Sequence, residues 1–155
     1  MTGGVLHQFI TQNSVNLLQL GAMQAGTLAA QIGIKLTAIG PDFLIGSMPV
    51  DERTVQPFGI LHGGASIALA ETLGSIGSFL LVSGIEGVRV AGVEVSGSHL
   101  RPALNGVVTG LCRPMRIGRT LHFWQIDIRD EARRLCCAAK LTVSIILPRN
   151  QAGTD

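Results

Sequence analysis

Apolar side chains recur at helical spacing near the start of the chain. Residues 14–32 follow this pattern, in which positions three and four apart share one face of a helix. Asn13 and Ser14 are residue types that cap helix N-termini, so either is a candidate N-cap. We therefore expect a helical lead-in over residues 1–30.

Short runs typical of strands follow the lead-in. Residues 34–51 hold two such runs, separated by Gly40, Pro41 and Asp42, which together form a turn signal. Because proline has no N–H to donate, Pro49 is expected to end the second strand or to lie near a sheet edge.

The C-terminal half consists of β-branched runs divided by turn residues. The breaks fall at Pro102, Asn105-Gly106, Gly118 and Asp130-Glu131. Four strands in an antiparallel meander account for this pattern. The alternation slips between Val90 and Val93, which predicts a β-bulge near Gly92.

A long apolar segment lies between the two groups of strands. It runs from Leu61 to about Val82 and predicts a helix of five or six turns. The segment is rich in glycine, and each glycine inside a helix costs up to ~1 kcal/mol relative to alanine. Close packing must offset this cost, so the helix is expected to be buried on most of its circumference. One central helix facing about six antiparallel strands is an α+β fold.

Composition narrows the class of protein. The chain of 155 residues is expected to be one domain, residues 1–155, and its 46% hydrophobic and 14% charged residues exclude a disordered chain. The net charge of +2 excludes a polycationic nucleic-acid binder. Ten of the 12 basic residues are arginine, whose planar fork suits phosphates but also surface carboxylates.

The cysteines and histidines bear on the cellular compartment and on metal binding. Three cysteines without a secretory signal favour a reducing compartment, and no uninterrupted apolar run reaches ~20 residues, so we expect a cytoplasmic protein without a membrane span. Cys136 and Cys137 are neighbours on a predicted strand, so they are expected to act as small hydrophobic residues rather than as a metal site or a disulfide. The four histidines lack metal-ligand spacing, and no metal site is expected.

Glu71 is the only formal charge between Arg53 and Glu86. An ionised carboxylate on a buried helix costs several kcal/mol unless it is paired or solvated by a cleft. One interpretation is structural, with Glu71 bonded to a hydroxyl group or paired with an arginine of a neighbouring strand. The other interpretation is catalytic.

The sequence His62-Gly63-Gly64 stands where the helix begins. Backbone N–H groups there have no intrahelical partner, and the helix dipole adds positive potential, so they form a donor site for a negative oxygen. A carboxylate together with such a site is what hydrolysis of an acyl group needs.

The distance between Gly63 and Glu71 along the helix indicates that a complete site needs a second subunit. Gly63 and Glu71 are eight residues apart, about 12 Å along one helix, so they cannot serve one carbonyl group within the same chain. Two helices crossing antiparallel near Ile67 about a two-fold axis would bring each Gly63 to the partner's Glu71. The pattern thus predicts a homodimer with two composite sites.

Residues 50–81 carry a motif: Gln-Pro-Phe-Gly, then His-Gly-Gly, then Ala-Glu at fixed spacing. In this the chain resembles the hotdog-fold acyl-CoA thioesterases, in the branch of the 1,4-dihydroxy-2-naphthoyl-CoA, enterobactin-proofreading and phenylacetate-pathway enzymes. The similarity covers about residues 30–147. It implies a hotdog fold, in which a sheet of about six strands wraps around one long central helix.

The resemblance also implies roles for five residues. Glu71 would act as general base on water or as nucleophile, Gln56 and His62 would orient the thioester carbonyl or the water, and the backbone N–H of Gly63 would bind the carbonyl oxygen. Ser75, one turn after the glutamate, would complete its surroundings. The residues alone leave other interpretations: Gln56 as a loop residue, His62 as a helix cap, and Ser75 as a packing residue.

Further residues are assigned by the resemblance to coenzyme A and the acyl group. His99 would lie near the acyl or pantetheine end, although Ser96 and Ser98 stand where the family pattern has asparagine, which leaves this role open. The candidates for the phosphates are Arg101, Arg116 and Arg119, with Gly118 allowing close backbone approach. Surface arginines without a specific ligand are the alternative.

The expected function is hydrolysis of an acyl-CoA, with an aromatic or medium-size acyl group. The coenzyme A thioester is the substrate, so no cofactor is expected, and the family commonly pairs two dimers into a homotetramer. A 3-hydroxyacyl thioester dehydratase is the first alternative, but it has a different motif order. A non-catalytic acyl-CoA sensor is the second, and it would not need Gln56, His62 and Glu71 together.

Overall fold

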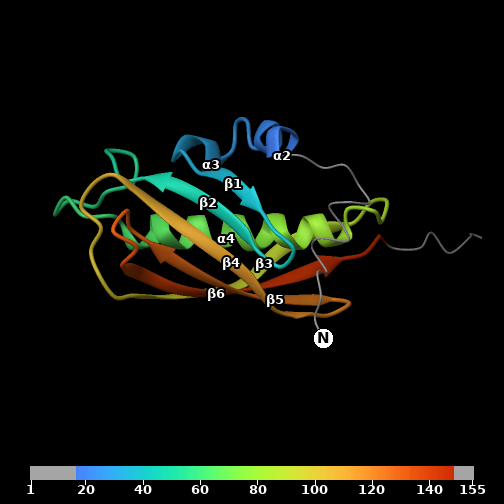
Figure 1. Cartoon of the computed structure of the whole chain (residues 1–155). Coiled ribbons are helices and arrows are strands. Elements are labelled where there is room, and N and C mark those ends of the chain that lie inside the picture. Colours follow the sequence, from blue (N-terminus) through green and yellow to red (C-terminus); the bar gives the residue numbers. More distant parts are fainter. Residues whose placement is uncertain (1–16, 149–155) are drawn as a thin grey trace, which may run out of the picture.

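A curved antiparallel sheet surrounds one long helix in the computed structural model, which describes residues 17–148 (Figure 1). The strands are β1 (Lys35–Ile39), β2 (Leu44–Pro49), β3 (Arg89–His99), β4 (Val107–Ile117), β5 (Leu121–Arg129) and β6 (Leu135–Ile146). The central helix is α4 (Gly63–Val82), and the short helices α2 (Leu17–Met23) and α3 (Leu28–Gln31) precede β1. This arrangement confirms the predicted α+β hotdog fold.

The order of the strands corrects one prediction. They lie in the order β1-β2-β4-β5-β6-β3, so β4, β5 and β6 form a meander, but β3 does not begin it. β3 is instead an edge strand that pairs with β6, with Arg89 opposite Ile146 and His99 opposite Cys137. The prediction was wrong because turn residues mark where a strand ends, and they do not say which strand it will join.

The connection from β3 to β4, residues 100–106, therefore crosses the end of the sheet. The N–H of Leu100 donates to the carbonyl of Cys136 (2.7 Å), and the carbonyl of Ala103 accepts from the N–H of Leu61 (2.8 Å). These bonds bring the connection against the residues that lead into α4.

Two β-bulges shape the sheet near this helix. The register between β3 and β6 shifts between Gly92 and Glu94, which confirms the predicted bulge. A second shift at the start of β6 leaves Cys136 without a partner on β5. Cys136 and Cys137 are both buried free thiols.

The N-terminal helical pattern is interrupted. Gly26 adopts a φ of +76°, in the left-handed region that ends helices, and the hydroxyl of Thr27 then caps α3. The pattern thus forms two short helices. The candidate N-caps Asn13 and Ser14 lie outside the described residues.

Helix α4 begins two residues later than the apolar pattern suggested. Leu61 pairs with Val55 in an isolated β-bridge, and His62 takes an extended backbone conformation as the N-cap. The first helical residue is therefore Gly63.

Paired glycines on the sheet make room for a helix side chain. Gly46 of β2 lies opposite Gly110 of β4, and methyl groups at these positions would lie 2.6 Å and 2.8 Å from the side chain of Leu73. Leu73 is fully buried in the resulting hollow.

Glycines on the helix make room for a sheet side chain in turn. A methyl group at Gly77 would lie 2.6 Å from Trp124, which is fully buried and donates its indole N–H to the hydroxyl of Ser78 (2.8 Å). The helical glycines are thus offset by close packing, as the sequence predicted.

The apolar character of α4 follows from this position. By length and mean hydropathy (1.6) the helix would be capable of crossing a bilayer, but 56% of its most apolar 18-residue window is buried inside the protein. A core helix packed against a sheet passes the same test, so its composition is explained by the fold.

Candidate active site

Glu71 lies in the middle of α4, on the side that faces β3. Its side chain is half-buried, and a methyl group at Gly92 would lie 2.5 Å from its Oε1 atom. Within residues 17–148, no hydrogen bond or ion pair reaches the carboxylate. The described residues therefore provide neither the hydroxyl nor the arginine that a purely structural glutamate would need.

Ser75 follows Glu71 by one helical turn and is also half-buried. Residues four apart lie on the same face of a helix, so the hydroxyl and the carboxylate share one side of α4. The hydroxyl has no hydrogen-bond partner among the described residues.

The first turn of α4 presents a free backbone donor. The imidazole Nδ1 of His62 accepts the N–H of Gly64 (2.8 Å), so His62 is the helix cap. The N–H of Gly63 donates to no group in the described part of the chain. It is thus available to an oxygen of a ligand.

His99 reaches this turn from the end of β3. A methyl group at Gly63 would lie 2.8 Å from the Nε2 atom of His99. The exposed imidazole therefore stands directly over the helix N-terminus, and only glycine at position 63 leaves it this space.

Gln56 lies in the loop that precedes α4. Its side-chain Oε1 accepts the N–H of Phe58, while its backbone N–H donates to the carbonyl of Ile60 (2.9 Å). The amide NH₂ remains as the free donor of this side chain. Phe58, at the tip of the same loop, is 89% exposed.

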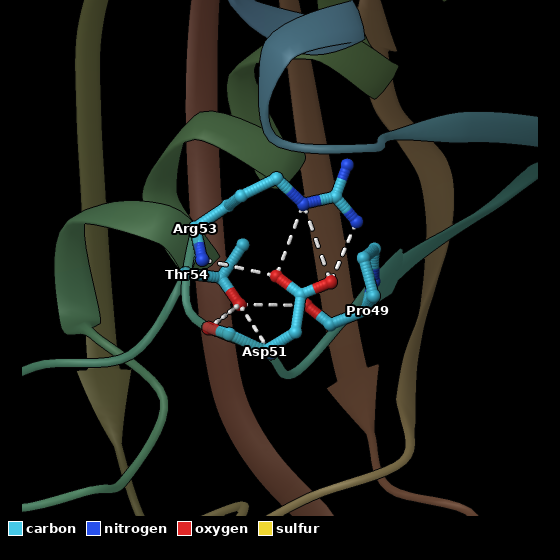
Figure 2. Close-up of polar contacts among 4 residues, drawn as sticks. All are labelled: Pro49, Asp51, Arg53 and Thr54. Carbon is cyan, nitrogen blue, oxygen red and sulfur yellow. Dashed lines mark hydrogen bonds and ion pairs between the residues drawn. The ribbon is translucent and has the colours of Figure 1, made fainter.

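A turn at the base of this loop is held by polar side chains (Figure 2). The guanidinium of Arg53 binds both carboxylate oxygens of Asp51, with the shortest distance 2.6 Å, and this hydrogen bonding lowers the pKa of Asp51 below its usual value. The hydroxyl of Thr54 donates to the carbonyl of Pro49 (2.7 Å) and accepts from the N–H of Asp51 (3.0 Å).

The predicted site residues of one chain thus form two separate groups. His62, Gly63 and His99 gather around the N-terminus of α4, and Gln56 lies in the loop before it, whereas Glu71 and Ser75 lie in the middle of the helix. Eight residues of helix between Gly63 and Glu71 correspond to about 12 Å.

A cavity of about 310 Å³ opens beside the N-terminus of α4. His99 and Arg101 line it together with Ser66, which was not among the predicted site residues, and Cys136, which was expected only as a small hydrophobic residue. Ser66 is four residues after His62, so helical periodicity would have indicated it. Cys136 joins the cavity only through the bulge in β6 and the crossing connection. Burial raises the pKa of its thiol.

The three candidate phosphate ligands are not brought together. Arg101 donates to the carbonyl of Leu135 at the start of β6 (3.1 Å). Arg116 lies opposite Phe123, whose partner on β6 is Thr142. Seven residues of strand separate the two positions on β6, about 20 Å, so Arg101 and Arg116 of one chain cannot hold the same phosphate.

Gly118 occupies the tight turn between β4 and β5. Its N–H donates to the carbonyl of Leu121 (3.0 Å), and a methyl group at Gly118 would lie 2.8 Å from that oxygen. The turn itself therefore requires glycine. Arg119, which follows it, is exposed and has no hydrogen bond or ion pair within residues 17–148. The same part of the chain holds no cluster of metal-ligating side chains.

Known proteins resemble this chain in sequence and structure. The family model described as the thioesterase superfamily matches residues 58–137. A 1,4-dihydroxy-2-naphthoyl-CoA hydrolase from Escherichia coli is 43% identical over 88% of this chain and 99% of its own length. A proofreading thioesterase from Cronobacter turicensis is 45% identical, covering 88% of this chain and 98% of its own. The crystal structure of a thioesterase from Haemophilus influenzae has a TM-score of 0.83 at 42% identity, covering 90% of this chain and 96% of its own.

Proposed function

The chain belongs to the thioesterase superfamily and is a thioester hydrolase, and we propose that its substrate is an acyl-coenzyme A with an aromatic or medium-size acyl group. In this reaction the oxygen of water bonds to the carbonyl carbon, the carbon–sulfur bond breaks, and the products are the free acid and the thiol of coenzyme A. The coenzyme A thioester is supported by the similarity to the 1,4-dihydroxy-2-naphthoyl-CoA hydrolase. The observation that carries the hydrolytic mechanism is the carboxylate of Glu71, half-buried on a core helix with no partner among the described residues.

The free N–H of Gly63 would bind the thioester oxygen. Its place at the positive end of α4 suits the negative charge that develops there in the transition state. Removing one such donor in other enzymes costs about 10²–10³ in kcat.

The carboxylate of Glu71 would take a proton from the attacking water, or attack the carbonyl itself to form a mixed anhydride that water then cleaves. Gln56 retains its NH₂ group, and His62 retains the Nε2 side of its ring, so both have a group free to orient the water or the carbonyl. His99, above Gly63, would contact the substrate beside the carbonyl.

The separation of the two groups supports a shared site in a homodimer. Ile67, halfway between Gly63 and Glu71, packs against Gly97 of β3, where a methyl group would lie 2.6 Å from it. Within residues 17–148, β3 bonds to β6 on one side only, so its other edge is open to a further strand. Two chains related by an axis near Ile67 would bring the Gly63 of each to the Glu71 of the other.

Coenzyme A would then contact arginines at both ends of the sheet. Arg101 and Arg116 of one chain are too far apart to bind one phosphate, so they would contact different phosphate groups or different coenzyme A molecules. The proposal also includes association into a homotetramer, in which Arg116 or Arg119 of another subunit would join Arg101 at one site. It also places the reaction in the cytoplasm, since three buried free thiols suit a reducing compartment, and it requires no cofactor or metal.

The test is release of free thiol from a panel of aromatic and aliphatic acyl-CoAs, with Glu71→Gln as the matched variant. We expect wild-type turnover and a loss of several orders of magnitude in the variant, with its fold and association unchanged. A variant that keeps more than about a tenth of kcat would remove Glu71 from the mechanism. Loss of water from a 3-hydroxyacyl-CoA added to the panel, without thiol release, would indicate the dehydratase instead.

Subunit mixing tests the composite site. Glu71→Gln and His62→Ala chains, each inactive alone, should recover about a quarter of wild-type activity after equal amounts exchange subunits. Half of the dimers are then mixed, and half of the sites in each mixed dimer are intact. No recovery in mixtures that contain mixed dimers would contradict the shared site.

A further inference from the structure

The loop before α4 is closed at its base by backbone hydrogen bonds. Nearer the tip of the loop, the backbone N–H of Gln56 donates to the carbonyl of Ile60 (2.9 Å). At the base, the N–H of His62 donates to the carbonyl of Thr54 (2.8 Å). Between these bonds, Val55 and Leu61 pair in the β-bridge described above. Thr54 therefore makes a backbone hydrogen bond to His62, the residue that precedes Gly63.

Thr54 differs from its neighbours in burial. It is only 2% exposed, and its hydroxyl both donates to Pro49 and accepts from Asp51. A hydroxyl group with its donor and one acceptor position used cannot rotate freely. The side chain thus fixes the position of its own residue against the end of β2.

The exposed part of the same turn has a different role. Asp51 and Arg53 form their ion pair at the surface, where such pairs contribute little to stability. The hydrogen bonds of the buried Thr54 hydroxyl therefore link the end of β2 to the loop before α4 (Figure 2). The ion pair holds the exposed side of the same turn.

A short chain of contacts then leads to the catalytic donor. The carbonyl of Thr54 holds the N–H of His62, and the peptide group between His62 and Gly63 carries the free N–H. A rotation at residue 62 would re-aim both the N–H of Gly63 and the imidazole of His62, which share one backbone unit.

We propose that Thr54 is a positioning residue for hydrolysis, whose buried hydroxyl holds the loop so that the N–H of Gly63 and the imidazole of His62 point at the thioester. This inference rests on the proposed function of the site. Thr54 touches no reacting atom and acts through His62.

Kinetics of three variants test it. Thr54→Val keeps the shape of the side chain but removes the hydroxyl, and we expect kcat to fall about tenfold to a hundredfold with KM little changed, because small displacements of catalytic groups cost rates of this order. Thr54→Ser restores the hydroxyl and should return kcat to within about threefold of wild type.

Ser78→Ala is the matched control for a purely structural effect. It too removes a buried hydroxyl that makes a hydrogen bond, with Trp124, but in the distal half of α4. We expect it to lower Tm as Thr54→Val does while leaving kcat unchanged. Equal kcat in Thr54→Val and Ser78→Ala, or failure of Thr54→Ser to rescue, would overturn the proposal.

A second readout does not depend on turnover. In amide and imidazole NMR spectra of the isotope-labelled full chain, Thr54→Val should move the signals of Gly63 and His62, and Ser78→Ala should not. Unmoved signals would overturn the positioning role even if the enzyme is active. Absence of thiol release by the wild type would instead contradict the proposed function, while the spectra still decide on Thr54.

Discussion

The carboxylate of Glu71 rests against the backbone of Gly92, at the bulge of β3: a methyl group on Gly92 would lie 2.5 Å from Oε1. The bulge therefore gives the glutamate its space. Because the clashing atom is the end of a flexible side chain, an added methyl group would displace the carboxylate and leave the fold in place.

Gly92→Ala should therefore lower kcat by about tenfold or more without a matching loss of Tm, since the displaced base no longer meets the water. Gly84→Ala is the control, because a methyl group there meets nothing within 4 Å. Steady-state kinetics and thermal melting of both variants check this, and wild-type kcat in Gly92→Ala would show that the contact is unimportant.

The pair formed by Gly63 and His99 gives a second prediction. Gly63→Ala should push the imidazole away and reduce kcat/KM, and His99→Ala should do so by removing it. If Gly63→Ala acts by displacing His99, the double variant Gly63→Ala/His99→Ala will have the same kcat/KM as His99→Ala alone. Additive losses would mean that the methyl group acts on the substrate rather than on the imidazole.

Packing of α4 on the sheet predicts a change in stability. Gly77→Ala places a methyl group 2.6 Å from Trp124 and 3.0 Å from Leu44, both fully buried, and should lower the free energy of unfolding by about 1–3 kcal/mol. Gly21→Ala in α2 has open space and should raise it by up to ~1 kcal/mol. Urea unfolding measures the free energy of unfolding of both variants. Equal values for Gly77→Ala and Gly21→Ala would contradict the close packing of Gly77 against Trp124.

His122 predicts how stability depends on pH. The side chain is 2% exposed, its Nδ1 has no partner within residues 17–148, and burial lowers the pKa of the imidazole below 6.5. The unfolded chain then binds the proton more readily, so the stabilising contribution is complete above about pH 6.5 and is lost as pH falls through the lower, folded-state pKa. The free energy of unfolding should decrease from about pH 7 to pH 5, and His122→Leu should flatten this decrease. An unchanged slope in the variant would assign the dependence to other groups.

Local patterns predicted the parts of this fold whose causes are local. Gly40 to Asp42 mark the β1–β2 turn, the apolar run up to Val82 marks α4, and Gly92 marks the bulge, because turn chemistry and helical spacing act over a few residues. The isolated charge of Glu71 likewise stood out in the sequence, since few residue types are so costly to bury.

Tertiary structure decided which of these parts meet. Three features depend on the connection that crosses the sheet: the place of β3 beside β6, the imidazole of His99 over Gly63, and the separation of Arg101 from Arg116. Residues far apart in the chain meet there because the sheet closes around α4 and buries the most apolar surface that way. No local pattern carries that information, because the free energy of burial belongs to the whole assembled core.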